Sequence, residues 1–168
     1  LVHAPTLSEA LGRRPGLLDG LIDASAFDPA PEVAVIAAEL GEREEGDDYQ
    51  TLLDRVRQRV GERRFALGVQ LIELASDPLD VAAGYSRLAE GAIEALVDAT
   101  VAEFEAAHGR IPGDGLVILA LGRLGGAALT HASDLDLIYL FDGDHLAESD
   151  GPKPLGATQY YNRLAQRV

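Results

Sequence analysis

Two aspartates stand two positions apart at the start of an apolar run, in the segment HASDLDLIYLFDGD (residues 131–144). Residues i and i+2 of a strand project to the same face, about 6.5 to 7 Å apart, so Asp134 and Asp136 are expected to point the same way. Two unpaired carboxylates in one cleft repel each other unless a cation lies between them. Mg²⁺ prefers carboxylate oxygens and keeps water molecules that substrate phosphates replace. The pair therefore predicts a two-metal magnesium site that binds a nucleoside triphosphate.

A glycine-rich turn, GRLGG (residues 122–126), precedes the aspartates. Gly122, Gly125 and Gly126 have no Cβ, so backbone N–H groups in this turn are expected to approach a phosphate closely. Arg123 adds a forked donor for the same phosphate. Arg123 lies eleven residues before the first aspartate, which lets the second strand fold back beside the first. The spacing therefore predicts that the turn and the carboxylates meet at one site.

Each of these motifs alone has an ordinary structural explanation. Glycine-rich turns follow strands in many folds, and this one lacks both the Gly-Lys-Ser/Thr of a Walker loop and the glycine spacing of a dinucleotide site. A lone Asp-x-Asp is usually a solvated strand end, and the histidines at 3, 108, 131 and 145 are too scattered for a metal cluster. Only the combination of strand, glycine turn, Ser133-Asp134-x-Asp136 and second strand is specific.

One long helix stands out in the first hundred residues, which read as helical throughout. Asp77 suits its N-cap, Pro78 its first position and Gly109 its end, and at about 1.5 Å per residue it would span roughly 45 Å. Such a helix is expected to link or brace two units, while Gly84 and Gly91 inside it allow a close helix neighbour. Another helix is expected over residues 49–74, where Gly61 predicts a bend.

The hydrophobic period changes after GRIPGDG. LVILAL (116–121) and DLDLIYLF (134–141) read as strands buried on both faces, and a last helix ends the chain. The sequence thus predicts an α+β protein, with a helical region over residues 1–110 and the first part of an α/β unit over residues 111–168.

Composition limits the classes of function. The formal net charge of −14 argues against a sequence-independent nucleic-acid binder, which needs a basic surface. No window approaches the roughly 18 to 20 apolar residues of a membrane span. With no cysteine there is no disulfide framework, which fits a cytoplasmic protein. There is also no methionine, even at residue 1, which predicts a piece of a longer chain.

The segment LALGRLGGAALTHASDLDLIYLFD resembles the signature of glutamine synthetase adenylyltransferase, a family in the nucleotidyltransferase superfamily of DNA polymerase beta type. The resemblance spans roughly residues 60–168 and includes SDGPKPLGATQYYNRLAQRV (149–168). It implies a small mixed sheet with flanking helices, preceded by a helical region. By position it assigns the glycine turn and Arg123 to the nucleotide, Ser133 to the edge of the site, and Asp134 and Asp136 to catalytic metal ions.

The resemblance also implies a function in nitrogen metabolism. One catalytic half of such enzymes transfers AMP from ATP to a tyrosine of glutamine synthetase, and the other removes it by phosphorolysis. The likeness of residues 149–168 favours the adenylylating, C-terminal half, with the adenylyl-removing half as the alternative. An alternative of another class is a non-catalytic fragment that binds glutamine synthetase or a PII-type nitrogen-signalling protein.

Two departures from the family pattern affect the expected activity. The family commonly has a glutamate shortly after the turn, where this chain has Ala127 and Ala128. A third catalytic carboxylate, expected on a later strand, has no counterpart up to Val168. The chain alone is therefore expected to be inactive.

Overall fold

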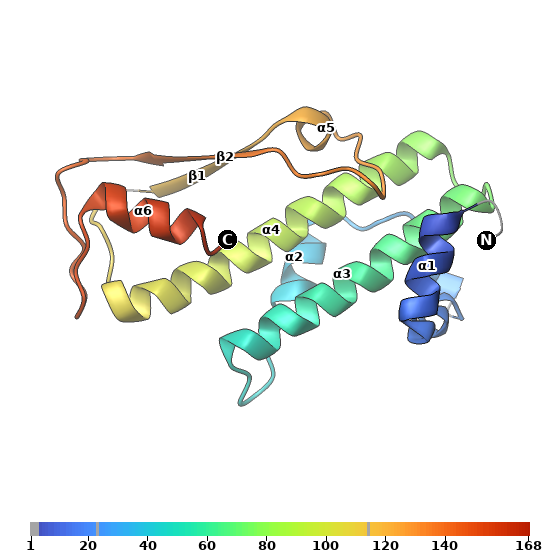
Figure 1. The fold of residues 1–168 in the computed structure, drawn as a ribbon, viewed down its shortest axis with the longest axis horizontal. Coiled ribbons are helices and arrows are strands. Elements are labelled where there is room, and N and C mark those ends of the chain that lie inside the picture. The colour runs from blue at the N-terminus through green and yellow to red at the C-terminus, as the bar shows by residue number, and fades with distance from the viewer. Residues whose placement is uncertain (1–3, 23, 114) are drawn as a thin grey trace.

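The computed structural model describes residues 4–22, 24–113 and 115–168 (Figure 1). The helical part contains α1 (Pro5–Arg13), the 3-10 helices η1 (Pro15–Leu21) and η2 (Ala24–Phe27), α2 (Val33–Gly41), α3 (Tyr49–Ile72) and α4 (Pro78–His108). It is followed by β1 (Gly115–Ala120), the short helix α5 (Gly122–Gly125), β2 (Leu137–Asp142) and α6 (Ala157–Ala165). This order confirms the predicted α+β class.

Helix α4 begins and ends where the sequence predicts. The side chain of Asp77 accepts a hydrogen bond from the N–H of Leu79 at 2.8 Å, which satisfies one of the first amides of the helix. Pro78 takes the first position, and Gly109 ends the helix with a φ of 72°, a conformation that favours glycine. These local signals therefore fix both ends of the longest helix.

Glycines let the helices pack closely around α4, which contacts α2 and α3. A Cβ on Gly91 would lie 2.6 Å from Cγ2 of Ile36, and one on Gly84 would lie 2.9 Å from Cδ2 of Leu67. The prediction of a close helix neighbour is thus confirmed. Helix α3 runs through Gly61 without a break, so this glycine does not interrupt the helix. Glycine weakens a helix by only about 1 kcal/mol, which the packing of α3 outweighs.

Strands β1 and β2 form an antiparallel pair, with partners running from Gly115 opposite Asp142 to Ala120 opposite Leu137. The resemblance implies a mixed sheet, but the described residues contain no parallel pair. Figure 1 shows the pair running alongside α4, on the side away from α3. The first strand begins one residue earlier than predicted, and the second begins at Leu137 instead of Asp134.

The expectation that both strands are buried on both faces is wrong. Side chains along each strand alternate between a half-buried and an exposed face. On the half-buried face, Leu116 and Phe141 pack into a core with α6 and the end of α4. The other face carries apolar side chains that are 42 to 49% exposed: Val117, Leu119, Ile138 and Leu140. A continuous apolar run fits either arrangement, so hydropathy alone does not reveal how many layers cover a sheet.

Two clusters of buried side chains meet along α4. The larger joins α2, α3 and α4 and also takes in Leu124 of α5 and Leu129 of the following loop. The other surrounds Phe104 near the end of α4 and includes α6. Residues 120–137 thus rest on the helical region, while the division into units at residue 110 stays a prediction. None of the helices in the described part of the chain is long and apolar enough to cross a membrane.

Candidate functional site

An open pocket lies where β1 ends and the approach to β2 begins. It is lined by Gly122, Arg123, Thr130, Ala132, Ser133, Asp134 and Asp136. The structure therefore brings together both predicted metal ligands, the start of the glycine turn and Ser133. Gly125 and Gly126 do not line it. Both aspartates are exposed to solvent, so their carboxylates are accessible to a ligand.

Backbone pairing places Asp136 against the glycine turn. The N–H of Leu121 donates to the carbonyl of Asp136 at 2.8 Å, which continues the antiparallel pairing one step beyond the strands. Gly122 follows with a φ of 55°, and a Cβ there would lie 2.4 Å from Oδ2 of Asp136. The backbone conformation favours glycine at this position, and a Cβ there would push the carboxylate of Asp136 aside.

Gly125 and Gly126 shape the turn from within. Their N–H groups donate to the carbonyls of Leu121 and Gly122, at 3.0 and 3.2 Å. A Cβ on Gly125 would lie 2.5 Å from the carbonyl oxygen of Ala120, so the turn closes tightly only with glycine there. Their predicted contact with a phosphate stays a prediction, and it has to compete with these hydrogen bonds.

The loop that leads into the aspartates is held by a turn at Ser133 and by two helix residues that the sequence did not indicate. Ser133 closes a turn with Thr130, whose N–H donates to Oγ of Ser133 at 3.0 Å. The loop is also bonded to Arg64 of α3 and to Ser86 of α4. Helical spacing does not distinguish these two polar side chains from polar side chains that make no such contact, so the sequence gives no signal for their contacts.

The carboxylate pair fits magnesium. The described residues contain no group of three or more His, Cys, Asp or Glu side chains that could hold a metal ion. Mg²⁺ does not need such a group, because one or two carboxylates, water molecules and substrate phosphates usually complete its octahedral shell. Asp134 and Asp136 offer oxygen ligands in an open pocket, which suits this mode of binding.

Comparison with known proteins gives a family. The family model described as glutamate-ammonia ligase adenylyltransferase matches residues 1–168. A protein from Mesorhizobium japonicum is 42% identical over 167 residues, which cover 98% of this chain and 17% of that protein. One from Xanthobacter autotrophicus is 40% identical over 171 residues, which cover 100% of this chain and 17% of that protein.

A third relative, from Agrobacterium fabrum, is 38% identical over 167 residues, again 98% of this chain and 17% of the relative. All three are described as bifunctional glutamine synthetase adenylyltransferase/adenylyl-removing enzymes. The chain thus spans 17% of the length of these relatives. With the family match over its whole length, the chain belongs to the glutamate-ammonia ligase adenylyltransferase family.

Proposed function

We propose that, within a complete protein, the pocket of Asp134 and Asp136 transfers AMP from ATP to a tyrosine of glutamine synthetase. The observation that carries this proposal is the convergence of both carboxylates with Gly122 and Arg123 in one pocket. The relatives' names add the acceptor protein and the nucleotidyl group. In this proposal the complete protein acts in the cytoplasm and controls nitrogen assimilation, and a PII-type signal protein is a further partner.

Each pocket residue has a part in this proposal. Asp134 and Asp136 would hold Mg²⁺, which when bound neutralises phosphate charge and stabilises the leaving pyrophosphate. Arg123 adds a cation that can bind a phosphate oxygen through two N–H groups. Gly122 leaves room for the carboxylate of Asp136. The tyrosine oxygen, which gives up its proton to water, then displaces pyrophosphate from the α-phosphorus of ATP, which leaves AMP on the tyrosine.

We favour the adenylylating direction over the removing direction because the tail SDGPKPLGATQYYNRLAQRV resembles the adenylylating, C-terminal half of such enzymes. The two directions use the same pocket and differ in their co-substrates. Adenylylated glutamine synthetase should be incubated with phosphate and with a full-length protein that contains this chain. For a full-length protein with two catalytic halves, the assay is repeated with Asp136→Asn. Release of ADP that this change abolishes would assign phosphorolysis to this pocket, whereas release that persists would assign it elsewhere.

Replacing one carboxylate tests the role of the acid pair. In the full-length protein, Asp136→Asn keeps the size of the side chain but removes a charge that would hold the metal ion. We expect transfer of labelled AMP to glutamine synthetase to slow by about a hundredfold or more. The melting temperature should stay nearly unchanged, because Asp136 is exposed.

Two control variants separate chemistry from folding. Asp142→Asn makes the same chemical change at the exposed far end of β2 and should leave transfer intact. Leu137→Asp puts a carboxylate among side chains that pack against the main core, and an unpaired charge there should cost several kcal/mol and unfold the unit. Transfer that survives Asp136→Asn would contradict the proposal and would leave an interaction role for the chain.

A further inference from the structure

The loop between the glycine turn and the aspartates has no regular secondary structure, so contacts with other elements set its position. The first contact is in the core. The N–H of Leu129 donates to Oγ of Ser86 in α4 at 3.2 Å, and that hydroxyl donates to the carbonyl of Ala82 at 3.1 Å. Ser86 is only 1% exposed, and its hydroxyl serves both partners. This buried contact anchors the loop to α4.

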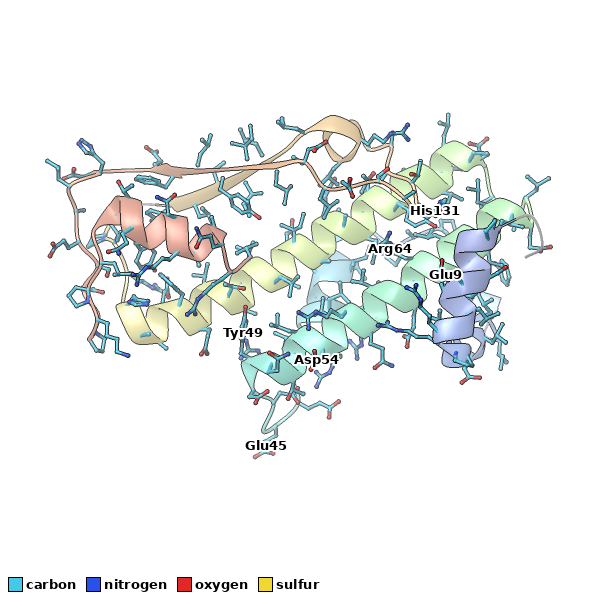
Figure 2. All side chains as sticks on the ribbon, viewed as in Figure 1. Glu9, Glu45, Tyr49, Asp54, Arg64 and His131 are labelled. Atoms are coloured by element: carbon cyan, nitrogen blue, oxygen red, sulfur yellow. The ribbon has the colours of Figure 1, made fainter. Side chains whose placement is uncertain are left out.

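The second contact comes from α3 and lies at the surface. Nη2 of Arg64 donates to the backbone carbonyl of His131 at 2.5 Å, and Figure 2 labels both residues, one on α3 and one on the loop. The backbone of Arg64 is itself fixed, because the hydroxyl of Tyr85 in α4 donates to its carbonyl at 3.0 Å. A charged donor on a fixed helix thus holds the loop three positions before Asp134.

A tight turn links the position of His131 to that of Asp134. The N–H of Ser133 donates to the carbonyl of Thr130 at 3.2 Å, and the N–H of Thr130 donates to Oγ of Ser133. These bonds tie the residues on both sides of His131 to each other. Asp134 follows Ser133 directly in the chain, so the turn and the first aspartate move together.

Arg64 borders a different cavity from the pocket of Asp134 and Asp136, which we call the acid pocket. Thr130 and Ser133 line the acid pocket, and they also line a second, largely apolar cavity to which Arg64 belongs. The loop therefore borders both cavities. Arg64 does not line the acid pocket, so it acts on the aspartates through the loop and not through contact with a ligand.

We propose that Arg64 is a positioning residue, which holds the loop so that Asp134 lies beside Asp136 and the glycine turn. The inference rests on the proposed function, because the positioned groups are its metal ligands. This role makes α3, in the helical region, part of the structure that positions the metal ligands. An exposed hydrogen bond of this kind contributes little to global stability, so its main effect is on the loop.

Arg64→Ala and Arg59→Ala form a matched pair for the test. Arg59 also lies on α3 and also donates to a backbone carbonyl, but that carbonyl belongs to Glu39 of α2. In the full-length protein, we expect Arg64→Ala to lower the rate of AMP transfer at saturating substrate by about tenfold and to weaken binding of Mn²⁺ alone by a similar factor. Arg64→Lys should restore much of both, since one N–H donor is enough for one carbonyl. Arg59→Ala should leave the transfer rate and the Mn²⁺ affinity near the wild-type values. It should lower the melting temperature at least as much as Arg64→Ala does.

Amide hydrogen exchange gives a readout that does not depend on activity. Exchange over residues 127–136 should be faster in Arg64→Ala than in Arg59→Ala. Equal exchange in the two variants, or a raised KM for ATP with an unchanged maximal rate, would overturn the positioning role. If Asp136→Asn leaves transfer intact while Arg64→Ala still speeds exchange, the proposed function fails and the loop contact stands.

Discussion

The contact between Gly122 and Asp136 joins the turn to the acid pair at the level of single atoms. Gly122→Ala would force a non-glycine residue to a φ of 55° and place its Cβ 2.4 Å from Oδ2 of Asp136. The backbone conformation alone costs about 1 to 2 kcal/mol, and the carboxylate has to move. We expect a lower free energy of unfolding for the 168-residue chain, measured in urea, and a loss of AMP transfer in the full-length protein.

Gly126→Ala is the control for this change. Gly126 has a φ of −91°, and the nearest atom to an added Cβ is the carbonyl oxygen of Gly122 at 3.5 Å. Both the backbone and the space therefore accept alanine, and we expect a free energy of unfolding close to that of the wild type. Equal losses in the two variants would mean that the turn as a whole is sensitive, and that the contact with Asp136 has no special role.

At the level of elements, the crossing of α2 and α4 depends on the absence of a side chain. Gly91→Ala would place a Cβ 2.6 Å from Cγ2 of Ile36 and 3.1 Å from the backbone nitrogen of Ala37. Overpacking of this kind costs about 1 to 3 kcal/mol, and the contact with the backbone of Ala37 puts this site above the roughly 1 kcal/mol that alanine adds to helix propensity. We expect Gly91→Ala to lower the urea midpoint of the chain.

Gly61→Ala should have the opposite effect. Gly61 lies in the middle of α3, and among the described residues the one atom within 4 Å of an added Cβ is Nη1 of Arg14, 3.3 Å away. That side chain can move aside, so the gain in helix propensity should raise the urea midpoint. If both variants shift the midpoint in the same direction, propensity and not packing governs these positions.

The elements also show what local sequence can predict. Capping residues and glycine positions predict both ends of α4, because they act within one turn of the helix. The pairing of β1 with β2, and the meeting of the turn with the aspartates, agree with the prediction that the second strand folds back beside the first. The open face of the strand pair was not predicted, because it depends on whether another element covers it.

At the scale of the whole molecule, the contacts that hold the site connect distant parts of the chain. Arg64 and His131 are 67 positions apart, and Ser86 and Leu129 are 43 apart. Neither pair leaves a periodic or compositional signal, so no local pattern could reveal it. The acid pocket could be predicted from the sequence, whereas the helices that hold its loop required the fold.

Buried phenols join the layers and make stability depend on pH. Tyr85 is 5% exposed and donates to the carbonyl of Arg64. Burial raises the pKa of Tyr85 from its usual value of 10.0 to about 12, against the opposing effect of the nearby Arg64 charge. Burial also raises the pKa of Tyr160 to about 12. Both phenols therefore stay protonated and keep donating at neutral pH.

These raised pKa values predict a loss of stability in alkaline solution. Below pH 10 both phenols are neutral in the folded and the unfolded chain; between about 10 and about 12 the unfolded chain releases the protons first. The unfolded state then binds fewer protons, so the free energy of unfolding falls as pH rises, by up to about 1.4 kcal/mol per pH unit for a fully shifted group.

Urea unfolding at about pH 9 and about pH 11 measures this slope. Removing the hydroxyl in Tyr85→Phe also removes its hydrogen bond, which lowers the free energy of unfolding at neutral pH by about 1 kcal/mol. The dependence of the free energy of unfolding on pH should nevertheless be weaker in Tyr85→Phe than in the wild type. It should be weaker still in the double variant with Tyr160→Phe. A slope that is the same in the wild type and in both variants would show that other groups control alkaline unfolding.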